Sequence, residues 1–99
     1  MAAYVITQVN VHDPETFDKY RAQAGPVLAK FGGEFLARGG KMEVLEGAWP
    51  FPRGVIIRFR DRQAAKIWHG SPEYGAIKKL RHASATANMI VVDGVDAGQ

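Results

Sequence analysis

The sequence contains no cysteine, which excludes disulfide bonds and thiolate metal ligands. Such a chain fits a reducing compartment, and we expect a cytoplasmic protein. No apolar run approaches the roughly 20 residues that a membrane-spanning helix needs, so no membrane contact is expected. The histidines, His12, His69 and His82, lack the spacing of metal ligands, so no metal site is expected. The glycines do not form a G-x-G-x-x-G pattern after a strand, and no cofactor is expected.

An excess of charge of one sign is also nearly absent, because the formal net charge is only +3. The excess is concentrated in residues 58–82, where seven basic side chains face only two acidic ones. The segment shows neither a recognition helix nor aromatic residues interleaved with charges on an exposed sheet, so nucleic acid is not an expected partner. One or two of these arginines pointing inward would instead suit a small anionic molecule.

The first half of the chain predicts a strand, a helix and a second strand. Residues 4–11 are rich in β-branched side chains and too short for a buried helix. Asp13-Pro14-Glu15 is typical of a helix start. Apolar residues then repeat at helical spacing until Gly32 or Gly33, which can supply the positive φ that ends a helix. A strand over residues 34–38 follows.

The second half predicts a hairpin arm, a strand, a divided helix and a final strand. Gly39-Gly40 favours a tight turn, after which residues 42–46 are expected to return as a strand. Two prolines keep residues 47–53 out of a central strand. Residues 55–59 read as a buried strand, Asp61 and Ser71-Pro72-Glu73 as two helix starts, and residues 89–92 as the last strand.

The order β-α-β-β-α-β indicates an α+β fold, a ferredoxin-like sandwich with an antiparallel sheet. We expect one domain over residues 1–94 and a flexible tail over 95–99. Two helical segments cover only one face of such a sheet, yet the strands carry apolar residues on both faces. An exposed apolar face of this size favours a homodimer that pairs through the sheet.

Candidate binding residues gather near the predicted hairpin. Arg38 can bind a carboxylate or enolate through its planar fork of donors, or it can form an ion pair with Glu43 or Glu46. Glu46 beside Trp49 is a candidate general base, or a structural partner of an arginine. Arg53 follows two prolines and points either into a cleft or to solvent.

Further candidates lie on the first strand and the last helix. Tyr74 and Arg81 are seven residues apart, hence on one helix face, and can bind a ligand or simply pack in the core. Asn10 can donate a hydrogen bond into a cleft or satisfy a turn. His69 is a candidate catalytic base or a surface histidine. The neighbouring Trp68 has the spacing of a core residue.

Taken together, several motifs resemble a known family across about residues 3–94. They are Asn10-Val11-His12-Asp13-Pro14-Glu15, Gly32-Gly33, Arg38-Gly39-Gly40, Glu46-Gly47, Trp49, Arg53, and Ser71-Pro72-Glu73-Tyr74 followed by Arg81. In order and spacing they are similar to the small bacterial proteins called domain of unknown function 1330, in the dimeric α/β barrel superfamily. The resemblance implies a ferredoxin-like fold that pairs as a dimeric α/β barrel. Superfamily relatives include cofactor-free monooxygenases, haem-degrading enzymes, lactone isomerases and dehydratases, all with a cleft between sheet and helices.

Two hypotheses follow. In the first, a homodimer binds a small anionic organic molecule between sheet and helices, with Arg38, Arg53 and Arg81 as charge partners, and any catalysis is cofactor-free proton transfer of an isomerase or monooxygenase-like kind. In the second, the dimer is a structural or ligand-sensing protein, and the polar cluster is a salt-bridge network.

Overall fold

The computed structural model describes residues 1–95, and the remaining residues of the expected tail, 96–99, lie outside the described residues. The elements follow the predicted order, with the second helix divided. They are β1 (Ala3–Val11), α1 (Pro14–Lys30), β2 (Glu34–Arg38), β3 (Arg53–Phe59), α2 (Arg62–His69), α3 (Pro72–Ser84) and β4 (Ala85–Asp93).

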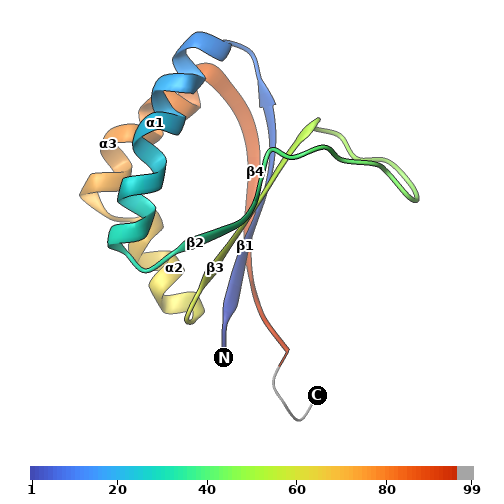
Figure 1. The fold of residues 1–99 in the computed structure, drawn as a ribbon. Coiled ribbons are helices and arrows are strands. Elements are labelled where there is room, and N and C mark those ends of the chain that lie inside the picture. The colour runs from blue at the N-terminus through green and yellow to red at the C-terminus, as the bar shows by residue number, and fades with distance from the viewer. Residues whose placement is uncertain (96–99) are drawn as a thin grey trace.

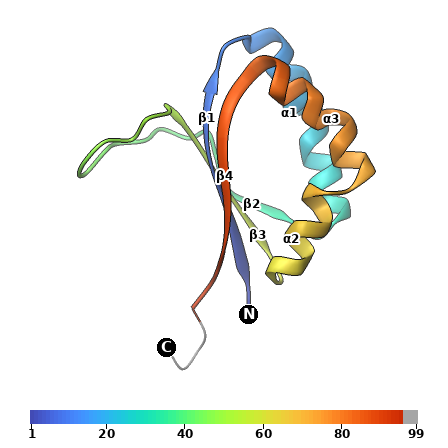
Figure 2. The ribbon, with the colours of Figure 1, turned by 180° about the vertical axis from the view of Figure 1, so that it is seen from behind.

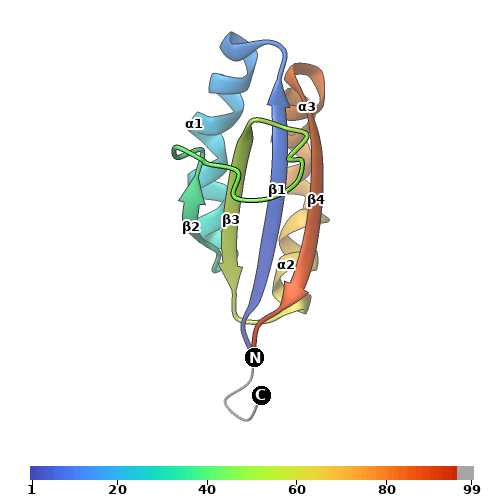
Figure 3. The same ribbon diagram turned by 90° about the vertical axis from the view of Figure 1, so that its right-hand side faces the viewer.

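The four strands form one antiparallel sheet in the order β2-β3-β1-β4. All three helices lie on one face of this sheet, so the molecule has two layers and its other face is open (Figures 1 and 2). Figure 3 shows that open face, with β1 and β3 at the centre and β2 and β4 at the edges. This is the expected α+β, ferredoxin-like arrangement.

Local sequence signals set the helix ends as predicted. Asp13 caps α1 by accepting a hydrogen bond from the backbone N–H of Thr16, and Asp61 caps α2 in the same way through Ala64. Ser71 Oγ accepts from the N–H of Tyr74 at the start of α3. Each cap satisfies one of the backbone donors that a helix start leaves unpaired. The chain leaves α1 through Gly32, whose φ of 79° disfavours residues with a side chain.

The core lies between the helices and the covered sheet face. Along β1, alternate residues from Ala3 to Val9 are buried, as the period of two in a strand requires. Trp68 of α2 packs on Tyr74 of α3 and on Phe59 of β3, with ring centroids 4.3 and 5.5 Å apart. These three aromatic rings join both short helices to the sheet.

The hairpin arm expected over residues 42–46 is wrong, because no strand forms there. Residues 39–52 instead make a long loop, here called the projecting loop, which leaves the sheet on the face opposite the helices (Figure 1). Gly39 turns the chain with a φ of 67°, and Pro50 and Pro52 cannot donate hydrogen bonds to a strand ladder. β3 therefore begins only at Arg53.

The open sheet face carries a group of exposed apolar side chains. Ile56, Ile90 and Val92 point outward there with 37%, 59% and 44% of their surfaces exposed. Large apolar side chains are also exposed in the projecting loop, among them Leu45 and Trp49. Within the described residues, no helix is long and apolar enough to cross a membrane.

Candidate functional site

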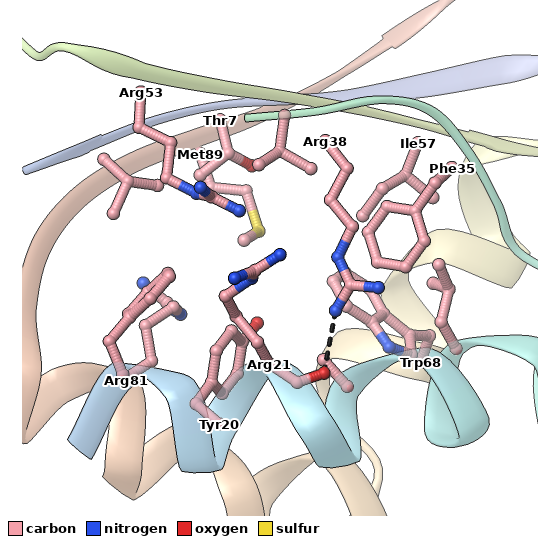
Figure 4. A pocket seen from close by; sticks show the side chains of 15 residues that line it. Thr7, Tyr20, Arg21, Phe35, Arg38, Arg53, Ile57, Trp68, Arg81 and Met89 are labelled. Atoms are coloured by element: carbon pink, nitrogen blue, oxygen red, sulfur yellow. Dashed lines mark hydrogen bonds between the residues drawn. The ribbon is translucent and has the colours of Figure 1, made fainter. Parts of the chain in front are cut away.

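A cleft lies between α1 and the covered face of the sheet, and it is closed below by side chains from α2 and α3. Four arginines line it: Arg21 from α1, Arg38 from β2, Arg53 from β3 and Arg81 from α3. Figure 4 shows Arg38 and Arg53 reaching from the sheet towards the helices, with Arg21 reaching back from α1. The volume is about 40 Å³, which is room for about three water molecules. Among the described residues that line this cleft there is no Asp, Glu or His.

A β-bulge aims Arg38 into the cleft. In a regular strand, residues three apart point to opposite faces. The pairing of β2 with β3 shifts register between Phe35 and Ala37, so that Leu36 is an extra residue and the alternation resets. Phe35 and Arg38 therefore share the cleft side, with the guanidinium 4.2 Å from the ring centroid. Arg38 Nη2 also donates a hydrogen bond to the backbone oxygen of Arg21 at 2.7 Å.

Arg53 reaches the cleft by ordinary strand alternation, because it is two residues before Val55 and four before Ile57, which also line it. Its guanidinium lies 5.4 Å from the ring centroid of Phe17. Gly39 leaves space for this side chain, since a Cβ at residue 39 would overlap the Arg53 guanidinium. The first residue of the projecting loop thus helps to shape the cleft on the other side of the sheet.

Positive charge in the cleft is only weakly compensated. Asp18 lies 3.7 Å from Arg21, and within the described residues the other three arginines form no ion pair with a carboxylate. Burial lowers the pKa of Arg53, and the nearby charges of Arg21 and Arg38 lower it further. A guanidinium nevertheless stays protonated at neutral pH, so the cleft repels cations and attracts anions.

Several buried polar side-chain atoms in the cleft have no hydrogen-bond partner. In the described part of the chain there are four such side-chain atoms: Thr7 Oγ1, Arg53 Nε, Trp68 Nε1 and Arg81 Nε. All four residues line this one cleft. Three of the atoms are N–H donors, and the threonine hydroxyl can also donate. Because leaving a buried donor unpaired costs about 1–3 kcal/mol, this concentration of donors indicates a place for an acceptor.

Tyr20 adds a hydroxyl to the cleft from α1. Its oxygen lies 2.8 Å from the hydroxyl of Tyr74, which is fully buried behind it. Burial raises the pKa of Tyr20 well above its ordinary value, and the Tyr74 hydroxyl raises it further. Tyr20 is therefore neutral, and one of the two hydroxyl protons of the pair remains available beyond their mutual hydrogen bond.

Of the predicted site residues, Arg38, Arg53 and Arg81 come together in the cleft. Tyr74 shares the α3 face of Arg81 but does not line the cleft, and it packs behind two residues that do, Tyr20 and Trp68. Trp68 is 2% exposed and belongs to the core as expected, yet it also lines the cleft.

The expectation that Glu46 lies beside Arg38 and Arg53 is wrong. Glu46 and Trp49 belong to the projecting loop, where they line a shallow groove with other loop residues. Within the described residues, Glu46 forms no ion pair with either arginine. Within the described residues, the predicted salt-bridge network of the hairpin does not form, because the chain leaves the sheet where a hairpin would have returned.

Asn10 and His69 also lie outside the cleft lining. Asn10 is one residue beyond Val9 on β1 and therefore points to the opposite face. His69 ends α2 and lines a neighbouring cavity. Its pKa is lowered by burial first, and then by the charges of Lys78, Arg81 and His82. Within the described residues, no cluster of His, Asp and Glu could hold a metal ion.

Sequence reasoning missed Arg21, Tyr20 and Thr7 as cleft residues. A signal for Arg21 was present, because it is three residues before Ala24 and seven before Leu28, on the buried side of α1. Tyr20 has the same helical spacing, which by itself predicts a core position rather than a cleft residue. Thr7 occupies an inward position of β1 between Val5 and Val9, where a hydroxyl is unusual.

The sequence matches a family model described as "Domain of unknown function (DUF1330)" over residues 2–95. The chain belongs to this family. The resemblance inferred from the motifs is thereby confirmed. No curated protein matches the chain in sequence.

Solved structures share the fold at low sequence identity. RPA0582 from Rhodopseudomonas palustris, a protein of unknown function, is 18% identical with a TM-score of 0.79, over 96% of this chain and 83% of its own. A dimeric ferredoxin-like protein of unknown function from Jannaschia sp. CCS1 is 14% identical with a TM-score of 0.75, over 95% and 100%. SnoaB from Streptomyces nogalater, a cofactor-independent oxygenase, is 13% identical with a TM-score of 0.66, over 97% and 95%. At these identities the likeness extends to the fold alone.

Proposed function

We propose that this protein is a homodimer that binds a small anionic organic molecule in the arginine-lined cleft. The observation that carries the proposal is the concentration of unpartnered buried donors on Thr7, Arg53, Trp68 and Arg81. An anion such as a carboxylate or enolate would accept hydrogen bonds from several of them and would offset the charges of the surrounding arginines.

Self-association is supported by the open sheet face. Ile56, Ile90 and Val92 are exposed there, whereas helices cover the other face. The Jannaschia protein, which has a similar fold, is itself dimeric. A second copy of the chain would remove these side chains from water by pairing the two open faces across a two-fold axis.

The binding proposal is tested with single-arginine variants and a panel of small carboxylates, measured by calorimetry at fixed ionic strength. Arg38→Ala and Arg53→Met are expected to lower affinity by roughly 10- to 150-fold each, because each removes charged hydrogen bonds to the ligand. Arg60→Met is the matched control, since Arg60 is largely exposed and lies outside the cleft. Equal affinities in all three variants would contradict the proposal.

A ligand-binding role is also separable from a structural one in the same variants. If Arg38 binds a ligand, Arg38→Ala leaves the melting temperature of the ligand-free protein nearly unchanged. If Arg38 instead holds a structural network together, the same substitution lowers the melting temperature and weakens the dimer, with no relation to carboxylate binding.

A second candidate function, cofactor-free proton transfer, is favoured by the Tyr20 hydroxyl in the cleft and its bond to Tyr74. A neutral phenol beside arginines can donate a hydrogen bond to a developing enolate. Because no Asp, Glu or His is among the described residues that line the cleft, a water molecule or hydroxide ion from solvent takes the proton that leaves the carbon. The test is exchange of the methyl protons of pyruvate with D₂O, followed by NMR. We expect acceleration by the wild-type protein and its loss in Tyr20→Phe, and a rate equal to that of buffer would remove this candidate.

A further inference from the structure

A second cavity adjoins the arginine cleft and shares two of its walls. It lies between α2 and β4 and has a volume of about 270 Å³, several times that of the cleft. Trp68 and Met89 line both spaces. Met89 pairs with Thr7 of the cleft in the sheet register, so the boundary between the two spaces runs along the middle of β1 and β4.

The two spaces differ in chemistry. The cleft collects guanidinium groups and unpartnered donors. The second cavity is walled mainly by apolar side chains, among them Val5, Ala65 and Val91, with Lys66 and His69 as its only basic groups among the described residues. Because burial and neighbouring cations lower the pKa of His69, that ring is neutral at pH 7. The second cavity therefore favours an uncharged, apolar group.

The sizes of the two spaces decide what can fit. The cleft has room for about three waters, which is enough for a carboxylate head but not for the rest of an organic molecule. Trp68 is 2% exposed and its Nε1 has no partner, so a buried donor stands at the boundary. Met89 is only half-buried and, like any methionine, has a flexible and polarizable side chain that can move aside.

We propose that the ligand is an amphipathic carboxylate whose anionic head lies among the arginines and whose apolar chain passes Trp68 and Met89 into the second cavity. This inference rests on the proposed function and adds the substrate class to it. Trp68 Nε1 would donate to the head group, and Val5, Ala65 and Val91 would contact the chain.

A chain-length series tests the inference by calorimetry at fixed ionic strength, with acetate, butyrate, hexanoate and octanoate as probes. We expect affinity to rise by up to about fourfold for each added methylene, as burial of a CH₂ group predicts. Alkylamines of the same lengths are the charge control and are expected to bind far more weakly, because the arginines repel them.

Val91→Phe fills the second cavity from β4 at a residue that does not itself line the cleft. It is expected to leave acetate binding unchanged and to abolish the rise with chain length. Ile67→Phe is the matched control, because Ile67 is 49% exposed on α2 and lines neither space. This control should reproduce the wild-type series.

A measurement on the wild-type protein keeps the test independent of how well Val91→Phe folds. Octanoate is expected to shift the methyl NMR signals of Ala65 and Val91, whereas acetate leaves them in place. A wild-type series that is flat from acetate to octanoate, or alkylamines that bind as well as carboxylates, would overturn the inference. If carboxylates bind with no dependence on length, the proposed anion site stands and only this inference fails; if no carboxylate binds, both fail.

Discussion

The two faces of the sheet differ in chemistry: buried polar groups lie beside the covered face, and apolar groups are exposed on the open face. The covered face packs against the helices, and the cleft between them holds four arginines, two from the sheet and two from the helices, together with the unpartnered buried donors found in the described residues. The open face exposes Ile56, Ile90 and Val92, and the projecting loop adds Leu45 and Trp49 on the same side. Buried polar groups without partners are costly and would be satisfied by a small polar ligand. Apolar groups exposed to water would be covered by another protein surface.

A single sheet can present two chemically different faces. Successive side chains of a strand point to opposite faces, so each face can be given its own chemistry by alternate residues. On β3, Arg53, Val55 and Ile57 line the cleft while Ile56 points outward. The same strand therefore supplies side chains both to the proposed binding site on one face and to the proposed dimer interface on the other.

The largest expected effect is the loss of the dimer in Ile56→Asp. A carboxylate buried at the centre of the open face, once in each copy, would cost several kilocalories per mole and raise the dimer Kd by at least about a thousandfold. Light scattering at micromolar concentration should then show a monomer. Ile67→Asp on the helix side is the control. A wild-type protein that is already monomeric would break the comparison, because the open face would then need no cover.

Arg81→Met tests the opposite claim for the covered face. Arg81 is 7% exposed, its Nε lacks a partner, and it forms no ion pair within the described residues. Replacing a buried unpaired charge by an apolar side chain of similar length should stabilise the ligand-free protein by about 2 kcal/mol. Thermal denaturation measures this, with Arg60→Met as the neutral control. A destabilised Arg81→Met protein would mean that Arg81 is structural.

Gly39→Ala tests whether the projecting loop on the open side influences the cleft on the covered side, because Gly39 begins that loop. Its φ of 67° disfavours a side chain, and a Cβ there would displace the Arg53 guanidinium. We expect a loss of about 1 kcal/mol in stability together with weaker carboxylate binding. The neighbouring Gly40, where a Cβ would meet nothing, is the matched control. Unchanged binding in Gly39→Ala would show that the loop and the cleft are not coupled.

The smallest expected effect is a change in pH dependence at His69. Burial and nearby cations lower the folded-state pKa of His69 below 6.5, so the unfolded chain binds its proton more readily. Stability is therefore full above pH 6.5 and falls as the pH drops from there through the lowered pKa. Urea denaturation between pH 7.5 and 5 should show that His69→Gln reduces this slope. An unchanged slope would assign the dependence to other groups.

Features of the fold that depend on neighbouring residues were predicted correctly from the sequence, whereas some features that depend on distant residues were not. Asp13-Pro14 and Ser71-Pro72 correctly predicted helix starts, because a helix cap is formed by residues that are close together in the sequence. Residues 42–46 carried a strand-like pattern, but a strand exists only if a neighbour pairs with it. Residues 42–46 have no strand beside them to pair with, because the chain turns away from the sheet at Gly39.

The site divided in the same way. Arg53 and Arg81 could be proposed from loop and helix spacing, whereas Glu46 was misplaced together with its strand. Arg38 was selected for its place at a strand end, but it faces the cleft because of the bulge at Leu36. The residue types around Leu36 do not predict a bulge at that position.

The sequence by itself determined the order of elements and the presence of apolar residues on both sheet faces, because periodicity and caps depend on neighbouring residues. Its motifs also resemble those of the family to which the chain belongs. Only the tertiary structure decided which arginines meet, and that they meet beside Thr7, Tyr20 and Trp68. The physical reason is that a cleft is assembled from elements far apart in the chain, whose relative placement depends on how α1 packs over the sheet and where one strand bulges.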